Sequence, residues 1–311
     1  MFFNSQQTGC DSGFGHKSAL RLNARGFTVY ATCLDAKGPG AENLMEKAAR
    51  PNHMHVRRMD VTNDQDIENV YNEIKADCDR GHAEGVCLYG VLNNAGIPRT
   101  GHIEWGQFDD HFVRAMEVNA LAPVRVMRKF LPLVREAKGR VVNIASTAGR
   151  YATLGHAAYS MSKAALISFT ETLRREMSIF NVHVVLIAPM FYRTNIINSE
   201  LIVKGMERMW MQTNKSVREA YGERYFNACK LAIRSILSSP VVAESLDDVI
   251  NAVDDAFTSP SPNYTYTCAS AAWMRLHYWL FSNIYCQEIA EIFSQAYTYI
   301  INGILRARPD L

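Results

Sequence analysis

The sequence of 311 residues lacks several features that would place it in a particular class of proteins. It contains no run of about eighteen apolar residues, so no membrane-spanning helix is predicted. It has no block of basic residues and a net charge of only +2, so no nucleic-acid partner is expected. Polar residues follow directly after Met1-Phe2-Phe3, and no secretory signal is evident.

Cysteine is present but not in an ordered pattern. The seven cysteines are scattered along the chain, odd in number, and show no C-x-x-C spacing. Such a distribution predicts neither a zinc site nor a disulfide framework. We therefore expect no metal and a reducing compartment.

Strand and helix patterns alternate along the first two thirds of the chain. Buried strands are predicted at 28–33, 55–59, 88–92, 141–145 and 182–187, and helices at 17–25, 63–78, 109–137 and 160–180. This alternation is typical of an α/β protein with a doubly wound parallel sheet covered by helices on both faces. No linker-like segment interrupts it, so we expect one domain over residues 1–270, with an elaborated helical C-terminal part that includes helices within 195–258.

The segment 271–311 is a distinct, aromatic C-terminal extension. Its apolar residues fall at helical spacing on one stripe: Ile289, Ile292, Phe293, Ala296, Tyr297, Ile300, Ile301, Ile304 and Leu305. Two interpretations are open. The helix packs on the body or on a second subunit, or it lies in a membrane interface with Arg306 and Arg308 at its polar end.

A glycine-rich segment near the N-terminus suggests a phosphate-binding loop. Thr8-Gly9-Cys10-Asp11-Ser12-Gly13-Phe14-Gly15 precedes a helical pattern that begins at Lys17. Glycines allow a tight turn and a close approach to a pyrophosphate, which the helix N-terminus stabilises. Asp60 then follows a strand, and Asn93-Asn94-Ala95-Gly96 follows another, which makes the ordered set more specific than the glycines alone.

A possible catalytic pair stands further along the chain. Tyr159 and Lys163 are four residues apart and therefore share one face of a helix. A free tyrosine has a pKa of ~10, so a nearby ammonium group is needed for its phenolate to form at neutral pH. We expect Lys163 to lower the pKa of Tyr159 in this way, and Ser146 could hold a substrate oxygen.

With these motifs in order, the chain resembles the classical short-chain dehydrogenase/reductase family over roughly residues 8–270. It looks most like the branch of retinol dehydrogenases, 17β- and 11β-hydroxysteroid dehydrogenases and D-3-hydroxybutyrate dehydrogenase. The segments that carry this similarity are 9–15, 130–134, 139–144 and 221–226. The resemblance implies a Rossmann-type dehydrogenase fold.

The resemblance also implies roles for individual residues. The catalytic residues would be Asn119, Ser146, Tyr159 and Lys163. The cofactor-binding residues would be Thr8, Gly9, Ser12, Gly13, Phe14, Gly15, Asp35, Asp60, Asn93, Gly96, Tyr159, Lys163 and Thr194. Structural alternatives stay open for some of them: Asp60 could cap a helix, Thr194 could be a turn residue, and Asn119 could link a helix to the sheet.

Cofactor and substrate are predicted less directly. An acid near the end of the second strand favours the free ribose of NAD, whereas NADP sites usually need an arginine; Asp35 therefore favours NAD over NADP. Aromatic and methionine side chains in 190–226 suit a lipophilic alcohol or ketone of steroid or retinol type. If Arg150 or Arg193 points inward, a small hydroxy acid such as 3-hydroxybutyrate fits instead.

Two departures from the family pattern stand out. Asn4-Ser5-Gln6-Gln7 occupies the place of a buried central strand, where unpaired amides are costly, which suggests a truncated or altered start. Met190 follows Pro189 where relatives have glycine close to the nicotinamide. These departures motivate an alternative interpretation, a non-catalytic cofactor-binding protein.

The resemblance further implies a homodimer or homotetramer formed through the long helices at 109–135 and 160–180. It implies association with the endoplasmic reticulum membrane, to which the C-terminal extension could contribute by peripheral contact. Cytoplasm and mitochondrion are the alternatives.

Overall fold

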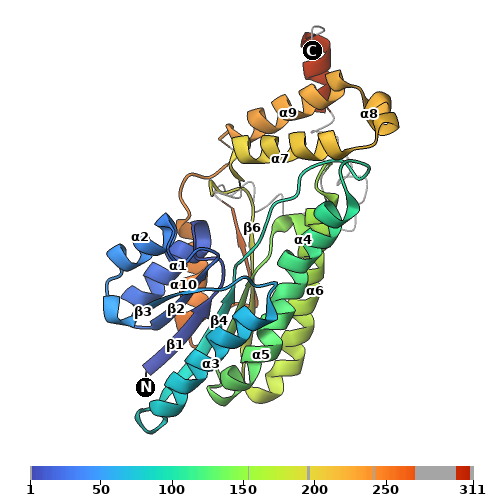
Figure 1. Cartoon of the computed structure of the whole chain (residues 1–311). Coiled ribbons are helices and arrows are strands. Elements are labelled where there is room, and N and C mark those ends of the chain that lie inside the picture. The colour runs from blue at the N-terminus through green and yellow to red at the C-terminus, as the bar shows by residue number, and fades with distance from the viewer. Residues whose placement is uncertain (1, 153, 195–196, 241, 270–298, 309–311) are drawn as a thin grey trace.

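The computed structural model describes residues 2–152, 154–194, 197–240, 242–269 and 299–308. Seven parallel strands form one sheet in the order β3-β2-β1-β4-β5-β6-β7 (Figure 1). They are β1 (Phe2–Gln7), β2 (Thr28–Cys33), β3 (Met54–Arg58), β4 (Val86–Asn93), β5 (Arg140–Ile144), β6 (His183–Pro189) and β7 (Thr265–Cys268). The predicted doubly wound parallel sheet is confirmed, and each predicted strand lies within about two residues of its observed position.

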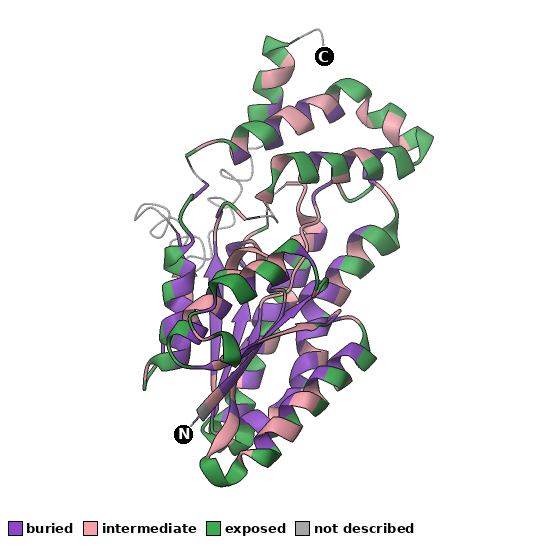
Figure 2. Ribbon diagram, turned by 60° about the vertical axis from the view of Figure 1, so that its left-hand side comes forward, coloured by how far each residue is buried: buried purple, intermediate pink, exposed green. Residues whose placement is uncertain are grey.

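Helices cover both faces of the sheet. One layer contains α1 (Gly13–Ala24), α2 (Pro39–Lys47) and α10 (Asp247–Thr258), and the other contains α3 (Asp64–Arg80), α5 (Ala122–Glu136) and α6 (Ala157–Met177). Figure 2 shows the central strands mostly buried between these layers, whereas the edge strands β3 and β7 are only partly buried. Burial on both faces explains why β5 and β6 read as mainly apolar runs in the sequence. Helix α2 has no counterpart among the predicted helices.

The helix predicted over 109–137 is divided in the structure. Two π-helical turns, Asp109–Val113 and Glu117–Leu121, flank the short α4 (Arg114–Met116), and α5 follows. A π turn contains an extra residue, which changes the side chain that faces inward and is common at functional sites. Asn119 lies in the second π turn.

Three helices lie above the carboxyl ends of the strands (Figure 1). These are α7 (Ser199–Gln212), α8 (Lys215–Tyr221) and α9 (Glu223–Leu237), and a core with Trp105, Trp210 and Phe226 at its centre holds them together. The other helix within 195–258, α10, packs against α1 and the sheet instead.

The described end of the C-terminal extension packs on this group of helices. Residues 299–307 are helical, and Ile301, Ile304 and Leu305 join the core around Trp210 and Phe226. This agrees with the first interpretation of the apolar stripe for these residues; the stripe from Ile289 to Tyr297 lies outside the described residues. Within the described ranges, none of the helices has the length and apolar character needed to cross a membrane.

Strand β1 forms at the centre of the sheet in spite of its polar sequence. It pairs with β2 on one side and with β4 on the other, and Asn4, Ser5, Gln6 and Gln7 are buried. Asn4 donates to the sulfur of Cys78 at 3.9 Å, but within the described part of the chain the Gln6 and Gln7 side-chain amides have no hydrogen-bond partner. Backbone pairing therefore holds the strand, while its side chains weaken it.

The Gln6 amide should be a measurable source of instability. A buried polar group without a partner costs about 1–3 kcal/mol, and leucine is an apolar side chain of broadly similar size to glutamine. We predict that Gln6→Leu raises the free energy of unfolding by about 1–3 kcal/mol in urea denaturation. The matched change at the exposed Gln65 should have little effect. If the parent and the Gln6→Leu variant have the same free energy of unfolding, this account of β1 is contradicted.

Candidate functional site

The glycine loop between β1 and α1 lies at the point where the strand order reverses, between β1 and β4. Gly9 and Gly13 have φ of +66° and +63°, in the left-handed region that favours glycine. A Cβ on Gly9 would lie 2.7 Å from the Cα of Ala95, and one on Gly15 would lie 2.5 Å from the Nδ2 of Asn94. The glycines therefore let the loop lie against the segment after β4.

Hydrogen bonds connect the glycine loop to that segment. The Thr8 hydroxyl accepts from the backbone N–H groups of Asn94 and Ala95, both at 2.9 Å. The Asn94 side chain donates to the carbonyls of Thr8 and Gly9 at 3.0 and 2.9 Å. Thr8 thus shapes the loop and does not line the cleft beside it.

A cleft of about 180 Å³ runs along the glycine loop at the carboxyl ends of the strands. Most of the predicted cofactor residues line it: Gly9, Ser12, Gly13, Phe14, Asp60, Gly96 and Thr194. This is the place where open α/β sheets bind nucleotides, with the phosphates at the N-terminus of the first helix. The positive-φ glycines and the open helix N-terminus fit a dinucleotide.

Asn93 and Asp35 are placed elsewhere. Asn93 is buried and donates to Asn143 at 2.8 Å, which links β4 to β5, and Asn94 lines the cleft in its place. Asp35 is exposed and accepts from the backbone of Lys37 at 3.0 Å. The acid in the cleft near the end of β2 is Asp11, which the sequence prediction missed although it lies within the glycine motif.

Asp11 is held by the backbone of the neighbouring loop. Its carboxylate accepts from the N–H of Leu34 at 3.0 Å and from the N–H of Asp35 at 3.3 Å. Leu34 also lines the cleft. A fixed carboxylate at this position presents hydrogen-bond acceptors and negative charge to whatever occupies the end of the cleft at β2.

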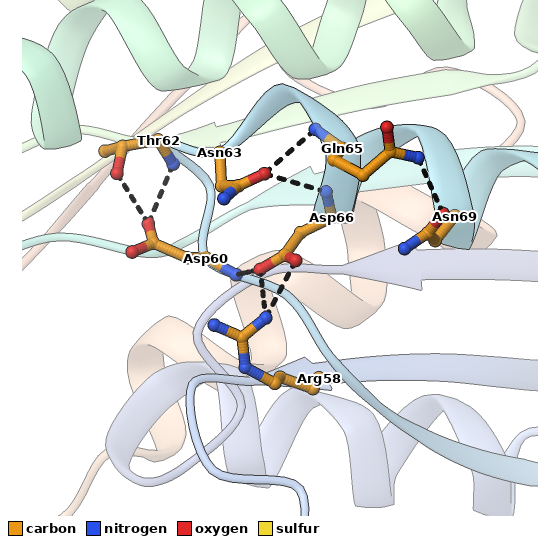
Figure 3. Close-up of polar contacts among 7 residues, drawn as sticks. All are labelled: Arg58, Asp60, Thr62, Asn63, Gln65, Asp66 and Asn69. Carbon is orange, nitrogen blue, oxygen red and sulfur yellow. Dashed lines mark hydrogen bonds and ion pairs between the residues drawn. The ribbon is translucent and has the colours of Figure 1, made fainter.

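Asp60 closes another side of the cleft (Figure 3). Its carboxylate accepts from the backbone N–H and the hydroxyl of Thr62 at 2.9 and 2.7 Å. Partial burial opposes ionisation, but the bonds from Thr62 and the charges of Arg114 and Arg58 lower the pKa of Asp60 below its usual value. The cap of α3 is Asn63, so Asp60 does not cap that helix.

Tyr159 and Ser146 meet at the floor of a second pocket, beside the end of β5. Ser146 caps a short 3₁₀ turn, where its hydroxyl accepts from the N–H of Ala148 at 3.2 Å. Burial raises the pKa of Tyr159, and its hydrogen bond with Ser146 lowers it. A phenol and a hydroxyl side by side in a desolvated pocket can hold one oxygen and exchange a proton with it.

Lys163 lies one helical turn after Tyr159 and is buried. Its Nζ donates to the carbonyl of Ile144 at 2.9 Å and lies 5.8 Å from the centre of the Tyr159 ring. Burial lowers the pKa of Lys163 to about 8. Desolvation of the phenol is the largest influence on the pKa of Tyr159 and raises it, so the lowering of this pKa by Lys163 stays a prediction.

Asn119 connects three parts of the site. Its Oδ1 accepts from the N–H of Ile97 at 2.8 Å, and its Nδ2 donates to the Ile97 carbonyl and to Ser162, both at 3.0 Å. Ser162 in turn donates to the carbonyl of Tyr159 at 2.7 Å. A Cβ on Gly96 would lie 3.3 Å from Asn119 Oδ1. Asn119 thus ties the loop after β4 to the start of α6, and its bonds do not reach a strand of the sheet directly.

The segment after β6 joins the cofactor cleft to the pocket. Thr194 lies against Gly13, where a Cβ would be 3.4 Å from its Cγ2. Two adjoining pockets meet here, and Met190, Ser146 and Tyr159 line both of them, whereas Lys163 lines one. The φ of Met190 is not positive, and its N–H donates to the Cys268 carbonyl at 3.0 Å. The backbone therefore accepts a side chain here without strain.

The pocket beyond Tyr159, about 100 Å³ in volume, is mainly apolar. Its lining includes Met190, Phe191, Ile197, Ile202 and Leu237, together with Arg99, Tyr151 and His156, which sequence reasoning did not identify. No motif marks these last three, because they come from loops whose packing brings them to the pocket.

Neither arginine considered for a small hydroxy acid is in this pocket. Arg150 pairs with Glu171, and Arg193 pairs with Glu244 at 2.8 Å.

Potential metal ligands are not clustered in the described residues, which contain no group of three or more histidine, cysteine or acidic side chains that could hold a metal ion.

Known proteins are similar to this chain in sequence and in fold. Residues 7–201 match the family model described as short chain dehydrogenase. Retinol dehydrogenase 7 from Rattus norvegicus is 38% identical over 267 residues, which are 86% of this chain and 79% of that protein. Retinol dehydrogenase 5 from Homo sapiens is 32% identical over 274 residues, with 88% and 81% covered.

A third relative is the short-chain dehydrogenase/reductase family 9C member 7 from Homo sapiens, 34% identical over 260 residues, which are 83% of this chain and 79% of that protein. Among solved structures, a short-chain dehydrogenase from Streptomyces avermitilis superposes with a TM-score of 0.67 at 22% identity and covers 96% of this chain and 98% of its own. At that identity the superposition shows the fold.

Burial of Lys163 makes a prediction about stability. Below pH 8 the folded chain carries a desolvated ammonium group, which opposes folding. Between about pH 8 and the ordinary pKa of 10.5, the unfolded chain keeps a proton that the folded chain has released, so stability should rise with pH. We expect Lys163→Met to be more stable at pH 7 by about 1–3 kcal/mol and to lack this rise.

The measurement is urea denaturation at pH 7 and pH 9.5, with the exposed Lys47→Met as the matched control. If Lys163→Met is less stable than the parent at pH 7, then the bond to Ile144 outweighs desolvation and this interpretation of Lys163 is wrong.

Proposed function

Because the chain belongs to the short-chain dehydrogenase family, we propose that it is an NAD-dependent oxidoreductase that interconverts an alcohol and a ketone or aldehyde on a lipophilic substrate. The observation that carries the proposal is the meeting of Tyr159, Ser146 and Lys163 at the junction of a nucleotide cleft and an apolar pocket. The nicotinamide of the bound cofactor would supply hydride acceptance and donation.

The residues of the chain would act on the proton and on the substrate oxygen. In the oxidative direction Tyr159 acts as the phenolate and takes the hydroxyl proton, and in the reductive direction the neutral phenol gives a proton to the substrate oxygen. Ser146 holds the same oxygen through its hydroxyl, as a polarising donor. Lys163 adds positive charge close to the phenolate when its amine is protonated, which its pKa of about 8 allows at neutral pH.

The substrate class follows from the pocket and from the relatives. Aliphatic and aromatic side chains dominate the lining around Tyr159, which suits a steroid or retinoid alcohol. Relatives named retinol dehydrogenases support the same class. A small hydroxy acid is less well supported, because Arg150 and Arg193 form ion pairs outside the pocket.

NAD is the proposed cofactor because Asp11 faces the cleft near the end of β2. A carboxylate can accept hydrogen bonds from the ribose hydroxyls, whereas it repels a 2′-phosphate. The arginine in the cleft, Arg114, lies on the other side, where its charge acts on Asp60.

The proposed proton-transfer role of Tyr159 can be tested by mutation. Tyr159→Phe keeps the ring and removes the proton-transfer group, so turnover of steroid and retinoid alcohols should fall by about 10²-fold or more. NADH binding, followed by fluorescence titration, should be unchanged. Unaltered turnover would refute the assignment. Saturable NADH binding by the parent without turnover of any alcohol or ketone tested would favour the non-catalytic alternative.

The proposed preference for NAD over NADP can be tested at Asp11. Asp11→Asn keeps an oxygen that can accept from Leu34 and removes the negative charge. We expect the ratio of the Kd values for NADPH and NADH to fall by about tenfold, which corresponds to 1.4 kcal/mol. Asp35→Asn should leave that ratio unchanged, because Asp35 lies outside the cleft. If Asp35→Asn changes the ratio and Asp11→Asn does not, the sequence expectation for Asp35 is correct.

A further inference from the structure

The pocket that contains Tyr159 continues into a larger groove. The groove has a volume of about 1290 Å³ and lies between α7 and the chain that follows β4. Pro98, Arg99, Thr100 and Ile202 line both spaces, so the two are contiguous. Figure 1 shows this part of the chain running up from the sheet to the end of α7 before it returns through α4. A ligand longer than the pocket would extend along this groove.

Two acids of α7 pair with cations of α9: Glu200 with Arg234 at 3.3 Å, and Glu207 with Lys230 at 3.1 Å. The cations of α7 that line the groove are Lys204 and Arg208, which are exposed. In the ranges described by the structure, neither forms an ion pair.

This arrangement leaves positive charge uncompensated in the groove. Lys204 and Arg208 are four residues apart, and like charges at that spacing on a helix repel each other. The acids in the groove lining, Asp110 and Glu207, already pair with Arg99 and Lys230. A negatively charged ligand group would relieve the repulsion.

Arg99 adds a third cation where the pocket meets the groove. Its side chain is 23% exposed, and it donates to the carbonyl and carboxylate of Asp110 at 2.8 and 3.2 Å. Burial lowers the pKa of Arg99, Asp110 raises it, and the charges of Arg114 and Arg208 lower it. Arg208 is therefore close enough for its charge to act at this junction.

The wall between these cations is apolar. Ile202, Met206 and Met209 line the groove together with Gly205, which lies between Lys204 and Arg208. A Cβ added to Gly205 would meet no atom within 4 Å. Glycine is less favourable than alanine inside a helix, and here it leaves the backbone of α7 open to the groove.

Resting on the proposed function, we propose that the substrate is an amphipathic alcohol with an anionic group at the end remote from the reacting hydroxyl. The hydroxyl lies at Tyr159 and Ser146, the apolar body runs past Ile202 and Gly205, and a carboxylate, sulfate or phosphate lies against Lys204 and Arg208. The groove thus selects substrates that carry a negative charge at a distance from the reacting hydroxyl.

The test compares two ligands that differ only in charge: a 3-hydroxysteroid with a side-chain carboxylate, and its methyl ester. Kd is measured by calorimetry and kcat/KM with NAD, both at low salt. The carboxylate should bind about tenfold more tightly than the ester, and added salt should reduce this ratio. In Lys204→Ala/Arg208→Ala the ratio should approach one. Lys215→Ala, an exposed cation on α8 outside the groove, should preserve it.

Several outcomes would overturn the inference. Equal binding of carboxylate and ester by the parent would do so, as would an unchanged ratio in the double variant. If the double variant loses only binding to vesicles that contain anionic lipid, the cations serve a membrane surface and not the substrate. A binding preference for the carboxylate without turnover of either ligand would instead refute the proposed dehydrogenase activity, while the ligand class would stand.

A second variant tests the path of the ligand independently of charge. Gly205→Leu places a side chain in the groove, and its Cβ would meet no atom within 4 Å, so the variant should fold. It should weaken binding of both ligands by about tenfold and leave NADH binding unchanged. Undiminished binding of both would show that the ligand does not pass α7, which would overturn the proposed path.

Discussion

The site depends on the pairing of β1 between β2 and β4. This pairing reverses the strand order at β1 and places the glycine loop against the segment after β4. The Thr8 hydroxyl and the Asn94 amide then join the two segments, and Gly9 allows their backbones to touch. The polar side chains of β1 oppose this arrangement, so the strand relies on main-chain hydrogen bonds and on the packing of its neighbours.

The candidate catalytic residues Lys163 and Tyr159 show a similar conflict between stability and proposed function. The buried lysine and the half-buried tyrosine are both shifted toward their neutral forms by desolvation. The surrounding bonds hold them in place: Ile144 accepts from Lys163, and Asn119 positions the start of α6 through Ser162. Charge developed here during a reaction is poorly screened, so each nearby hydroxyl or ammonium group has a strong effect on it.

Of the three helices above the sheet, α7 and α9 contribute Ile202 and Leu237 to the pocket around Tyr159. Their core is aromatic, and the end of the C-terminal extension packs into it through Ile301. Glu200 and Glu207 of α7 hold that helix to α9, which leaves Lys204 and Arg208 toward the groove. Because Glu200 and Glu207 are already paired with α9, they leave the charges of Lys204 and Arg208 available to the proposed substrate.

Local patterns in the sequence were sufficient for the sheet, most of the helices, the glycine loop and the Tyr159–Lys163 pair, because periodicity and motif spacing depend on neighbouring residues. They were not sufficient for β1, whose position depends on pairing with β2 and β4, or for the π turn that carries Asn119. Nor could they show that Asp11 and not Asp35 faces the cleft, or that Arg150 and Arg193 are paired elsewhere. Which side chain enters a site, and how burial changes its pKa, depends on residues distant in the chain, and only the tertiary structure brings those together.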